Sequence, residues 1–229
     1  MSGHTHFDEA TEEYLEAIYR LEREGEGATT SGLAAELGVA PASVSGMIKR
    51  LVGEGYLEQR ARGDARLTEK GLAIAVRVMR RHRLAECFLV KILGMGWEEV
   101  GPDACMLEHA ISPRVEERLL AVLGNPSVCP HGHPIPSLDL SEPERPGLPL
   151  ATIEPGRSVV MHAIKEKAPE VLLYLASIGL VPGAAVKVLQ RAPLGGPVTI
   201  SVAEAAHAIS IELASAVLVL PTAESNAGR

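Results

Sequence analysis

Residues 29–71 carry the pattern that decides the fold: TTSGLAAELGVAPASVSGMIKRLVGEGYLEQRARGDARLTEKG. Apolar residues at helical spacing predict a short helix that ends at Gly38 and a second helix that begins near Pro41, where the missing N–H of proline is not needed. Downstream, GYLEQR and ARLT predict two short strands joined by a turn at Gly63 and Asp64. A helix, a tight turn, a second helix and a hairpin make a winged helix-turn-helix, which is a DNA-binding motif.

Polar residues of this motif are the candidates for contact with DNA. The second predicted helix turns hydroxyl and ammonium groups outward, and the hairpin carries guanidinium groups that suit phosphate oxygens. The formal net charge of −7 does not contradict this, because residues 1–28 alone hold eight acids against two bases. The candidates are Ser43, Ser45, Lys49, Arg60, Arg62 and Arg66.

Helical patterns flank the motif on both sides. An amphipathic helix is predicted before it, and after it come a long helix with Thr68 as its N-cap, a helix preceded by Pro102, and a third helix with Pro113 in its first turn. We expect the apolar helices that follow the motif to form a dimer surface. The predicted ranges are 8–24, 68–93, 103–111 and 113–123.

The last third of the chain changes character. Proline, glycine and serine are dense between residues 124 and 156, and from Thr152 onward short apolar runs (SVVMHAI, AAVKVLQ, PVTISV, HAISIE, AVLVL) predict a small β-barrel. The predicted fold class is therefore multi-domain and mainly α, with an N-terminal winged helix-turn-helix, a helical dimerisation domain and a C-terminal β-barrel. The predicted boundaries are 1–72 for DNA binding, 73–143 for dimerisation and metal binding, 144–151 for a linker and 152–229 for the barrel.

Composition limits the cellular setting. No stretch approaches about 20 consecutive apolar residues, so no membrane span is predicted. The N-terminus lacks the basic and apolar regions of a secretory signal. Three cysteines are too few, and odd in number, for a disulfide framework, which favours a reducing cytoplasm.

One group of residues indicates a metal site. Cys105, Glu108 and His109 have i, i+3 and i+4 spacing, so they share one face of a helix. Carboxylates, imidazole and thiolate gathered without a cation are costly through repulsion and desolvation, whereas a divalent ion removes that cost. Carboxylates suit Mn²⁺, imidazole suits Fe²⁺, Ni²⁺ and Zn²⁺, and thiolate favours softer ions. Two further pairs at helical spacing belong to the candidate set: His82 with Glu86, and Glu13 with Glu16.

A second run, CPHGHP, has two interpretations. Cys129, His131 and His133 have the donor types of a metal site, but the proline and glycine content also suits a rigid turn, which we favour. The isolated His162 and His207 are expected to be ordinary residues of the barrel.

These motifs in this order resemble the iron-dependent repressor family, of the diphtheria toxin repressor and manganese transport regulator type. The resemblance runs through APASVSGMIKRL, RRHRLAECFL, DACMLEHAIS, CPHGHPIP and LASIGLVPGAAVKVL…PLGGPVTISV. The last of these is similar to the SH3-like domain of iron-transport accessory proteins, so the resemblance implies that the barrel is SH3-like.

The resemblance also implies a ligand set. Cys105 falls where iron-type members have cysteine and manganese-type members have glutamate, whereas Glu16 matches a carboxylate of the manganese type. Iron-type members use a histidine at the position of Gly101, so their ancillary site must differ here, with His162 or Glu166 as substitutes. The implied ligands are Glu13, Glu16, His82, Glu86, Cys105, Glu108 and His109.

In the recognition helix, Gly46 replaces a glutamine of the iron type. Ala40, Pro41 and Ser43 look like the manganese type, which adds Ala40 and Pro41 to the candidates for DNA contact.

The function that the resemblance implies is a homodimeric repressor. It binds palindromic double-stranded operators when loaded with Mn²⁺ or Fe²⁺, with manganese slightly favoured, and controls metal-uptake genes; Zn²⁺, Co²⁺ or Ni²⁺ are expected to bind in vitro. No enzymatic activity is expected. Two alternatives stay open: a metal-dependent hydrolase, which lacks an HExxH signature here, and a DNA-binding protein with a purely structural metal.

Overall fold

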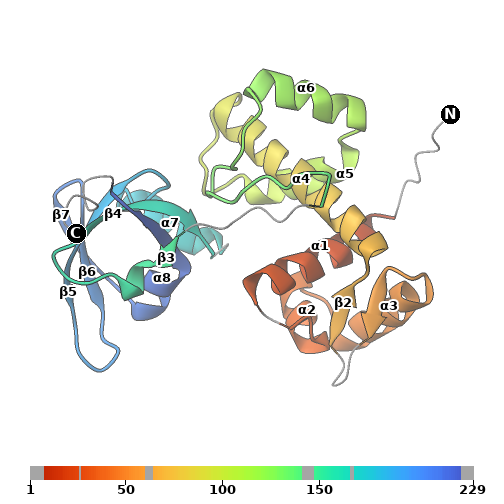
Figure 1. The fold of residues 1–229 in the computed structure, drawn as a ribbon, viewed down its shortest axis with the longest axis horizontal. Coiled ribbons are helices and arrows are strands. Elements are labelled where there is room, and N and C mark those ends of the chain that lie inside the picture. The colour runs from red at the N-terminus through yellow and green to blue at the C-terminus, as the bar shows by residue number, and fades with distance from the viewer. Residues whose placement is uncertain (1–7, 26, 60–63, 141–146, 166–167, 223–229) are drawn as a thin grey trace. The chain divides into compact units, whose positions relative to one another are not determined.

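The computed structural model describes residues 8–25, 27–59, 64–140, 147–165 and 168–222 (Figure 1). No helix in these ranges is long and apolar enough to cross a membrane. The helices are α1 (Glu9–Glu24), α2 (Thr30–Leu37), α3 (Pro41–Gly53), α4 (Glu69–Lys91), α5 (Gly101–Ala110), α6 (Pro113–Leu123), α7 (Pro169–Ser177) and α8 (Ile211–Ala216), with a 3-10 turn, η2, at Leu150–Thr152. The strands are β1 (Leu57–Gln59), β2 (Ala65–Leu67), β3 (Leu148–Pro149), β4 (Ser158–Ile164), β5 (Ala185–Arg191), β6 (Val198–Val202), β7 (Ala205–Ile209) and β8 (Val217–Pro221).

The chain forms two compact units. The first unit comprises the described parts of residues 1–82, 105–117 and 136–143. The second comprises the described parts of residues 83–104, 118–135 and 144–229. The predicted boundary at 72/73 falls inside α4, and the one at 143/144 lies outside the described residues, so both stay predictions.

The first unit contains the predicted helix-turn-helix. Local chemistry sets the helix ends, because Asp8 and Thr29 each accept a hydrogen bond from the backbone N–H three residues further on, at 2.7 and 3.1 Å. Gly38 ends α2 in the left-handed region at φ +65°, and Pro41 opens α3. Side chains from these helices form one core that includes Leu15, Ile18, Leu33, Ile48 and Leu51.

The predicted wing is also present. Strands β1 and β2 pair antiparallel, with Leu57 opposite Leu67. Thr68 caps α4 as predicted, since its hydroxyl accepts a hydrogen bond from the N–H of Gly71 at 3.1 Å. A Cβ at Gly71 would overlap the carbonyl of Tyr56, so glycine is needed for α4 to start this close to the wing. The predicted turn at Gly63 lies outside the described residues.

The bounds of α6 agree with the prediction, whereas the start of α5 does not. The third helix runs from Pro113 to Leu123, as predicted. The second was predicted to start after Pro102, which is wrong: α5 begins at Gly101 and Pro102 lies inside its first turn, where proline loses no hydrogen bond.

The second unit contains the predicted β-rich region. Its antiparallel sheet has the strand order β3-β8-β4-β5-β6-β7 and buries an apolar core that includes Leu150, Met161, Leu175 and Ile200. The run HAISIE was predicted as one strand, but the strand β7 ends at Ile209, and Ser210 caps the short helix α8. The predicted linker 144–151 overlaps structured residues, since β3 pairs with β8 and Leu150 is fully buried.

The CPHGHP loop packs on β4 within this unit. The backbone N–H of Ile164 donates to the carbonyl of His131 at 3.3 Å. Gly132 has φ +83°, and a Cβ there would overlap the carbonyl oxygen of His162. The predicted rigid turn is therefore present, and it orients the side chains of Cys129 and His131.

Candidate metal centre

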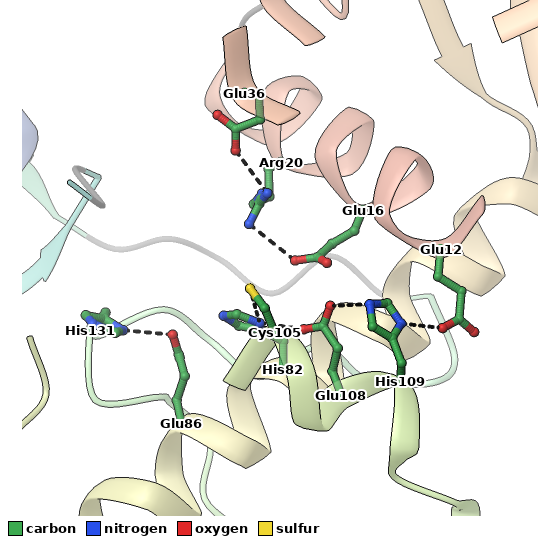
Figure 2. Close-up of polar contacts among 10 residues, drawn as sticks. All are labelled: Glu12, Glu16, Arg20, Glu36, His82, Glu86, Cys105, Glu108, His109 and His131. Carbon is green, nitrogen blue, oxygen red and sulfur yellow. Dashed lines mark hydrogen bonds and ion pairs between the residues drawn. The ribbon is translucent and has the colours of Figure 1, made fainter. Parts of the chain in front are cut away.

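The candidate site of the first unit lies between α1, α4 and α5. Helix α5 presents Cys105, Glu108 and His109 on one face, as their spacing predicted, and α4 supplies His82 (Figure 2). Helices α4 and α5 alone therefore bring together four of the seven predicted ligands.

His82, Cys105 and Glu108 form the tightest group. His82 Nδ1 lies 2.5 Å from Glu108 Oε2 and 3.9 Å from Cys105 Sγ. One donor atom from each of the three lies within 4.8 Å of the other two. A carboxylate, an imidazole and a thiol at this separation can share one divalent ion.

Glu108 is the most perturbed carboxyl of this group. Its side chain is 1% exposed. Its pKa is raised to about 7, chiefly by burial and also by the negative charge and hydrogen bond of Glu16, against the lowering effect of the neighbouring His82. Burial and a neighbouring carboxylate both favour the protonated form of this group, and a bound cation would stabilise its charged form.

His109 joins this group to α1. Its Nδ1 lies 2.7 Å from Glu12 Oε2, and its Nε2 lies 3.3 Å from Glu108 Oε1. The hydrogen bond to Glu12 raises the pKa of His109 against the opposing effect of burial. Glu9 and Glu13, one helical turn apart, also have donor atoms within 4.8 Å of those of His109.

Glu16 is buried, and it faces this group from α1. It contacts Glu108 through the hydrogen bond that raises the pKa of that carboxyl group, and Arg20 through an ion pair of 3.3 Å. The structure therefore holds Glu16 beside the site but not within the tight groups that contain His82 or His109.

Glu86 forms a group of its own with residues of the second unit, so its predicted place beside His82 stays a prediction. Its carboxylate lies 3.0 Å from Nδ1 of His131 in the second unit, and Cys129 completes this group (Figure 2). The reason is geometric: four residues along α4 advance the helix by about 6 Å, so Glu86 reaches a different loop.

The three side chains of this second cluster are buried. Nε2 of His131 lies 2.8 Å from the carbonyl oxygen of Trp97 and donates to it, so in the neutral ring the lone pair of Nδ1 faces Glu86. Burial raises the pKa of Cys129 well above its usual value, and the charge of Glu86 raises it further. A lone pair, a carboxylate and a thiol directed at one another fit a shared divalent ion.

The donor sets of both clusters suit transition metals. Each combines one imidazole, one carboxylate and one thiol, a mixture that is compatible with Mn²⁺ or Fe²⁺ and with softer ions. His162 and Glu166 were considered as substitute ligands for the ancillary site. Glu166 lies outside the described residues, and His162 belongs to neither cluster in the described chain.

The candidates for DNA contact lie mostly on one exposed helix. Ser43, Ser45 and Lys49 are exposed on α3, as are Ala40 and Pro41 at its start. The hydroxyl of Ser45 donates to the carbonyl of Pro41 at 3.1 Å. The wing candidates Arg60 and Arg62 lie outside the described residues.

An ion pair joins the recognition helix to α1. The guanidinium of Arg50 on α3 donates to both carboxylate oxygens of Asp8, at 3.3 and 3.1 Å, and to the hydroxyl of Thr11. Asp8 also caps α1, and these bonds lower its pKa. The helix that borders the metal centre is thus bonded directly to the helix that carries the DNA candidates.

Several residues at or near the candidate centre were not predicted from the sequence. Glu9 and Glu12 were passed over in favour of Glu13 and Glu16, although all four stand at helical spacing on α1. The ion pair of Arg20 with Glu36 joins α1 to α2, and no local sequence signal marks it.

Three family models match the chain. They are described as the N-terminal DNA-binding domain of iron-dependent repressors (residues 6–65), the metal-binding and dimerisation domain of iron-dependent repressors (residues 68–137) and the FeoA domain (residues 148–221). With the wing, the helices and the antiparallel sheet, they confirm the predicted fold class.

Individual relatives agree with these models. The iron-dependent repressor IdeR of Mycobacterium tuberculosis is 37% identical over 225 residues, which cover 89% of this chain and 97% of the relative. A solved manganese-dependent transcriptional repressor in complex with manganese has a TM-score of 0.85 at 32% identity, covering 93% of this chain and all of the other. The repressor ScaR with bound Zn²⁺ has a TM-score of 0.79 at 28% identity, covering 93% and 99%.

Proposed function

Because the chain belongs to the iron-dependent repressor family, we propose that it is a metal-activated transcriptional repressor that binds palindromic operators as a homodimer and controls metal-uptake genes. The observation that carries this proposal is the group of His82, Cys105 and Glu108, which lies against α1 beside the helix-turn-helix. No enzymatic role is proposed, and the protein is expected to act in the cytoplasm.

Mn²⁺ or Fe²⁺ is the proposed activator, with manganese slightly favoured. The acids of α1 support manganese, since oxygen ligands suit this hard ion, whereas Cys105 supports iron and softer metals. Zn²⁺, Co²⁺ and Ni²⁺ are expected to bind in vitro. The proposed residues of this centre are Glu13, Glu16, His82, Cys105, Glu108 and His109.

A second ion is proposed for the cluster of Glu86, Cys129 and His131. The lone pair of His131 Nδ1, directed at the carboxylate of Glu86, supports it. In this proposal Glu86 binds the second ion rather than the ion of the first centre.

Activation is proposed to work through α1. An ion shared by α1 and α5 favours one placement of α1, and α1 is bonded to α3 through Asp8 and Arg50. A dimer presents two recognition helices to major grooves about 34 Å apart, so a small shift of α3 changes operator affinity. An ion shifts this equilibrium only through its different affinity for the two states.

The proposed contacts with DNA come from the exposed start of α3 and from the wing. Serine and lysine side chains suit phosphate oxygens, which position the protein, more than base edges. These residues are Ala40, Pro41, Ser43, Ser45, Lys49, Arg60 and Arg62.

The test is operator binding under anaerobic conditions. A palindromic duplex, selected from random DNA with the Mn²⁺-loaded protein, is titrated with Mn²⁺, Fe²⁺ or Zn²⁺ present. Binding is expected to require Mn²⁺ or Fe²⁺ and to vanish in His109→Ala and Glu13→Ala; metal-independent binding by these variants would overturn the proposal. Cys105→Glu alongside is expected to move the preference toward Mn²⁺.

Two controls separate the alternatives. A purely structural metal predicts that chelation unfolds the protein, whereas a sensor stays folded, as circular dichroism reports, and releases DNA. A hydrolase predicts turnover of a phosphoester or peptide that is lost in Glu108→Ala.

A further inference from the structure

Arg20 occupies the space between the metal centre and the helix-turn-helix. From α1, its guanidinium forms one ion pair with Glu16 at 3.3 Å and a second with Glu36 on α2 at 3.0 Å (Figure 2). The side chain of Arg20 is 17% exposed, and that of Glu16 is 4% exposed. The ion pair with Glu16 is therefore largely desolvated, which makes it more sensitive to a nearby charge than a pair in open solvent, whereas Glu36 is 31% exposed and its pair is only partly desolvated.

The surroundings of Arg20 include the metal centre itself. Burial lowers the pKa of Arg20, but the charges of Glu16, Glu36, Cys105 and Glu108 together hold it above its ordinary value. Two of these, Cys105 and Glu108, belong to the tight donor group with His82. The guanidinium thus stabilises the negative charges that a divalent ion would otherwise stabilise.

Glu16 has two competing partners. On one side its hydrogen bond to Glu108 raises the pKa of that buried carboxyl group, and on the other side Arg20 holds it. A divalent ion attracts Glu16 more strongly than a single positive charge at the same distance.

We propose that Arg20 is a positioning residue that holds Glu16 in the ion-free protein and yields it when an ion binds, which links occupancy of the metal centre to α2 through Glu36. The inference rests on the metal-activated repression proposed above. In the ion-free state, Arg20 ties Glu16 to Glu36. In the loaded state, Glu16 would turn toward the ion, and Arg20 would keep its ion pair with Glu36.

This link makes opposite predictions for its two ends. Arg20→Gln removes the competing charge, so Mn²⁺ affinity is expected to rise on the order of tenfold. Glu36→Gln leaves the guanidinium with Glu16 as its remaining ion-pair partner, so Mn²⁺ affinity is expected to fall by a similar factor. The double variant is expected to follow Arg20→Gln, because without the guanidinium Glu36 has no effect to transmit.

Operator binding provides a second readout. Coupling between sites is reciprocal, so a residue that links them changes the gain in operator affinity that Mn²⁺ produces. That gain is expected to shrink in both Arg20→Gln and Glu36→Gln, although their Mn²⁺ affinities move in opposite directions. A residue that only stabilises the fold would weaken Mn²⁺ binding in both variants.

The experiment measures free Mn²⁺ by electron paramagnetic resonance during titration of the full chain without DNA. Arg23→Gln is the matched control, since it removes the same charge from α1 where Arg23 stacks on Tyr19, 5.0 Å from the ring centroid; its Mn²⁺ affinity is expected to stay within about twofold. Thermal unfolding establishes that each variant is folded. If Arg20→Gln is not folded, Arg20→Lys replaces it, and the Mn²⁺ affinity of Arg20→Lys is expected to lie between those of the wild type and Glu36→Gln.

The outcomes separate the two proposals. Tighter binding in Arg20→Gln with weaker binding in Glu36→Gln supports the link. Equal or weaker binding in Arg20→Gln, with saturable binding in the wild type, overturns the link alone. Absence of saturable Mn²⁺ binding to the wild type overturns the proposed function, and the link with it.

Discussion

Glu12 and His109 lie 97 residues apart in the chain, and their side chains meet at 2.7 Å between Oε2 and Nδ1. The contact joins α1 to α5 and leaves Nε2 of the same ring facing Glu108 at 3.3 Å. A neutral histidine that donates through one ring nitrogen to a carboxylate presents the lone pair of the other nitrogen, which is the usual orientation of a metal-ligating histidine. We therefore expect Glu12 to orient His109 for the ion proposed at this centre.

Removing this carboxylate is expected to weaken metal binding without removing a ligand. Glu12→Gln replaces a charged acceptor with a neutral one, so His109 is held less firmly and becomes less basic. Loss of such a partner commonly costs about 10- to 100-fold in metal affinity. Calorimetric titration with Mn²⁺ measures the loss, and Glu117→Gln, which alters an exposed acid of α6, serves as the control. Unchanged affinity in Glu12→Gln would show that the hydrogen bond does not orient His109.

Metal affinity is expected to rise with pH up to neutrality. Glu108, with its pKa raised to about 7, and His109, with a raised pKa, both hold protons that an ion must displace. As the pH falls below about 7, the apparent affinity for the ion is expected to fall by up to about tenfold per pH unit for each proton that binding releases. Above about pH 7 the affinity is expected to change little with pH. Mn²⁺ titrations from about pH 6 to about pH 8 measure this slope. A flat profile over that interval would contradict the coupling of ion binding to Glu108.

The stability of the ion-free chain is expected to change in the opposite direction. The folded-state pKa of Glu108 is above its unfolded value of 4.5, so the folded state binds the proton more tightly, and stability falls as the pH rises from about 4.5 to about 7. The loss is at most about 3 kcal/mol, and the raised pKa of His109 adds a loss of the same sign above pH 6.5. Urea unfolding with a chelator present measures it, and Glu108→Gln is expected to show a shallower fall. An equal pH dependence in both proteins would exclude Glu108 as the cause.

The sequence predicted the winged motif and one helix face of the centre because both depend on local spacing. The i, i+3, i+4 pattern of Cys105, Glu108 and His109 places them together on any α-helix, and Gly38 with Pro41 marks the turn between α2 and α3. Such features need no knowledge of tertiary packing.

What the sequence did not predict depends on contacts between distant elements. The i, i+4 spacing of His82 and Glu86 holds on α4, but it does not predict the contact of His82 with Glu108 or that of Glu86 with His131. The sequence also could not predict which acids of α1 face the candidate centre. Several of them have suitable helical spacing, and only the packing of α5 against α1 distinguishes between them. The bond between Arg20 and Glu36 bridges two helices and has no local signature.

The two clusters are expected to bind ions independently. Cys129→Ser replaces the thiol of the second cluster, in which Glu86 and His131 lie 3.0 Å apart, and leaves His82, Cys105 and Glu108 unchanged. Equilibrium dialysis with Co²⁺ or Mn²⁺ is expected to give about two ions per chain for the wild type and about one for the variant. The Cys105→Ser variant is the matched control, because it makes the same change in the other cluster. A single ion in the wild type would contradict a separate second site.

Asp8 has two roles at the junction of α1 and α3. It caps α1 through the N–H of Thr11 and accepts two hydrogen bonds from Arg50. Asp8→Asn keeps an efficient cap but loses the charge, whereas Asp8→Ala loses both. The free energy of unfolding, measured by chemical denaturation, is therefore expected to be about 1 kcal/mol lower in Asp8→Ala than in Asp8→Asn. If the bond to Arg50 transmits the position of α1, both variants lose operator affinity in the presence of Mn²⁺, although only one loses the cap. Operator affinity that follows stability, and is normal in Asp8→Asn, would assign Asp8 to capping alone and would require another route from the metal centre to α3.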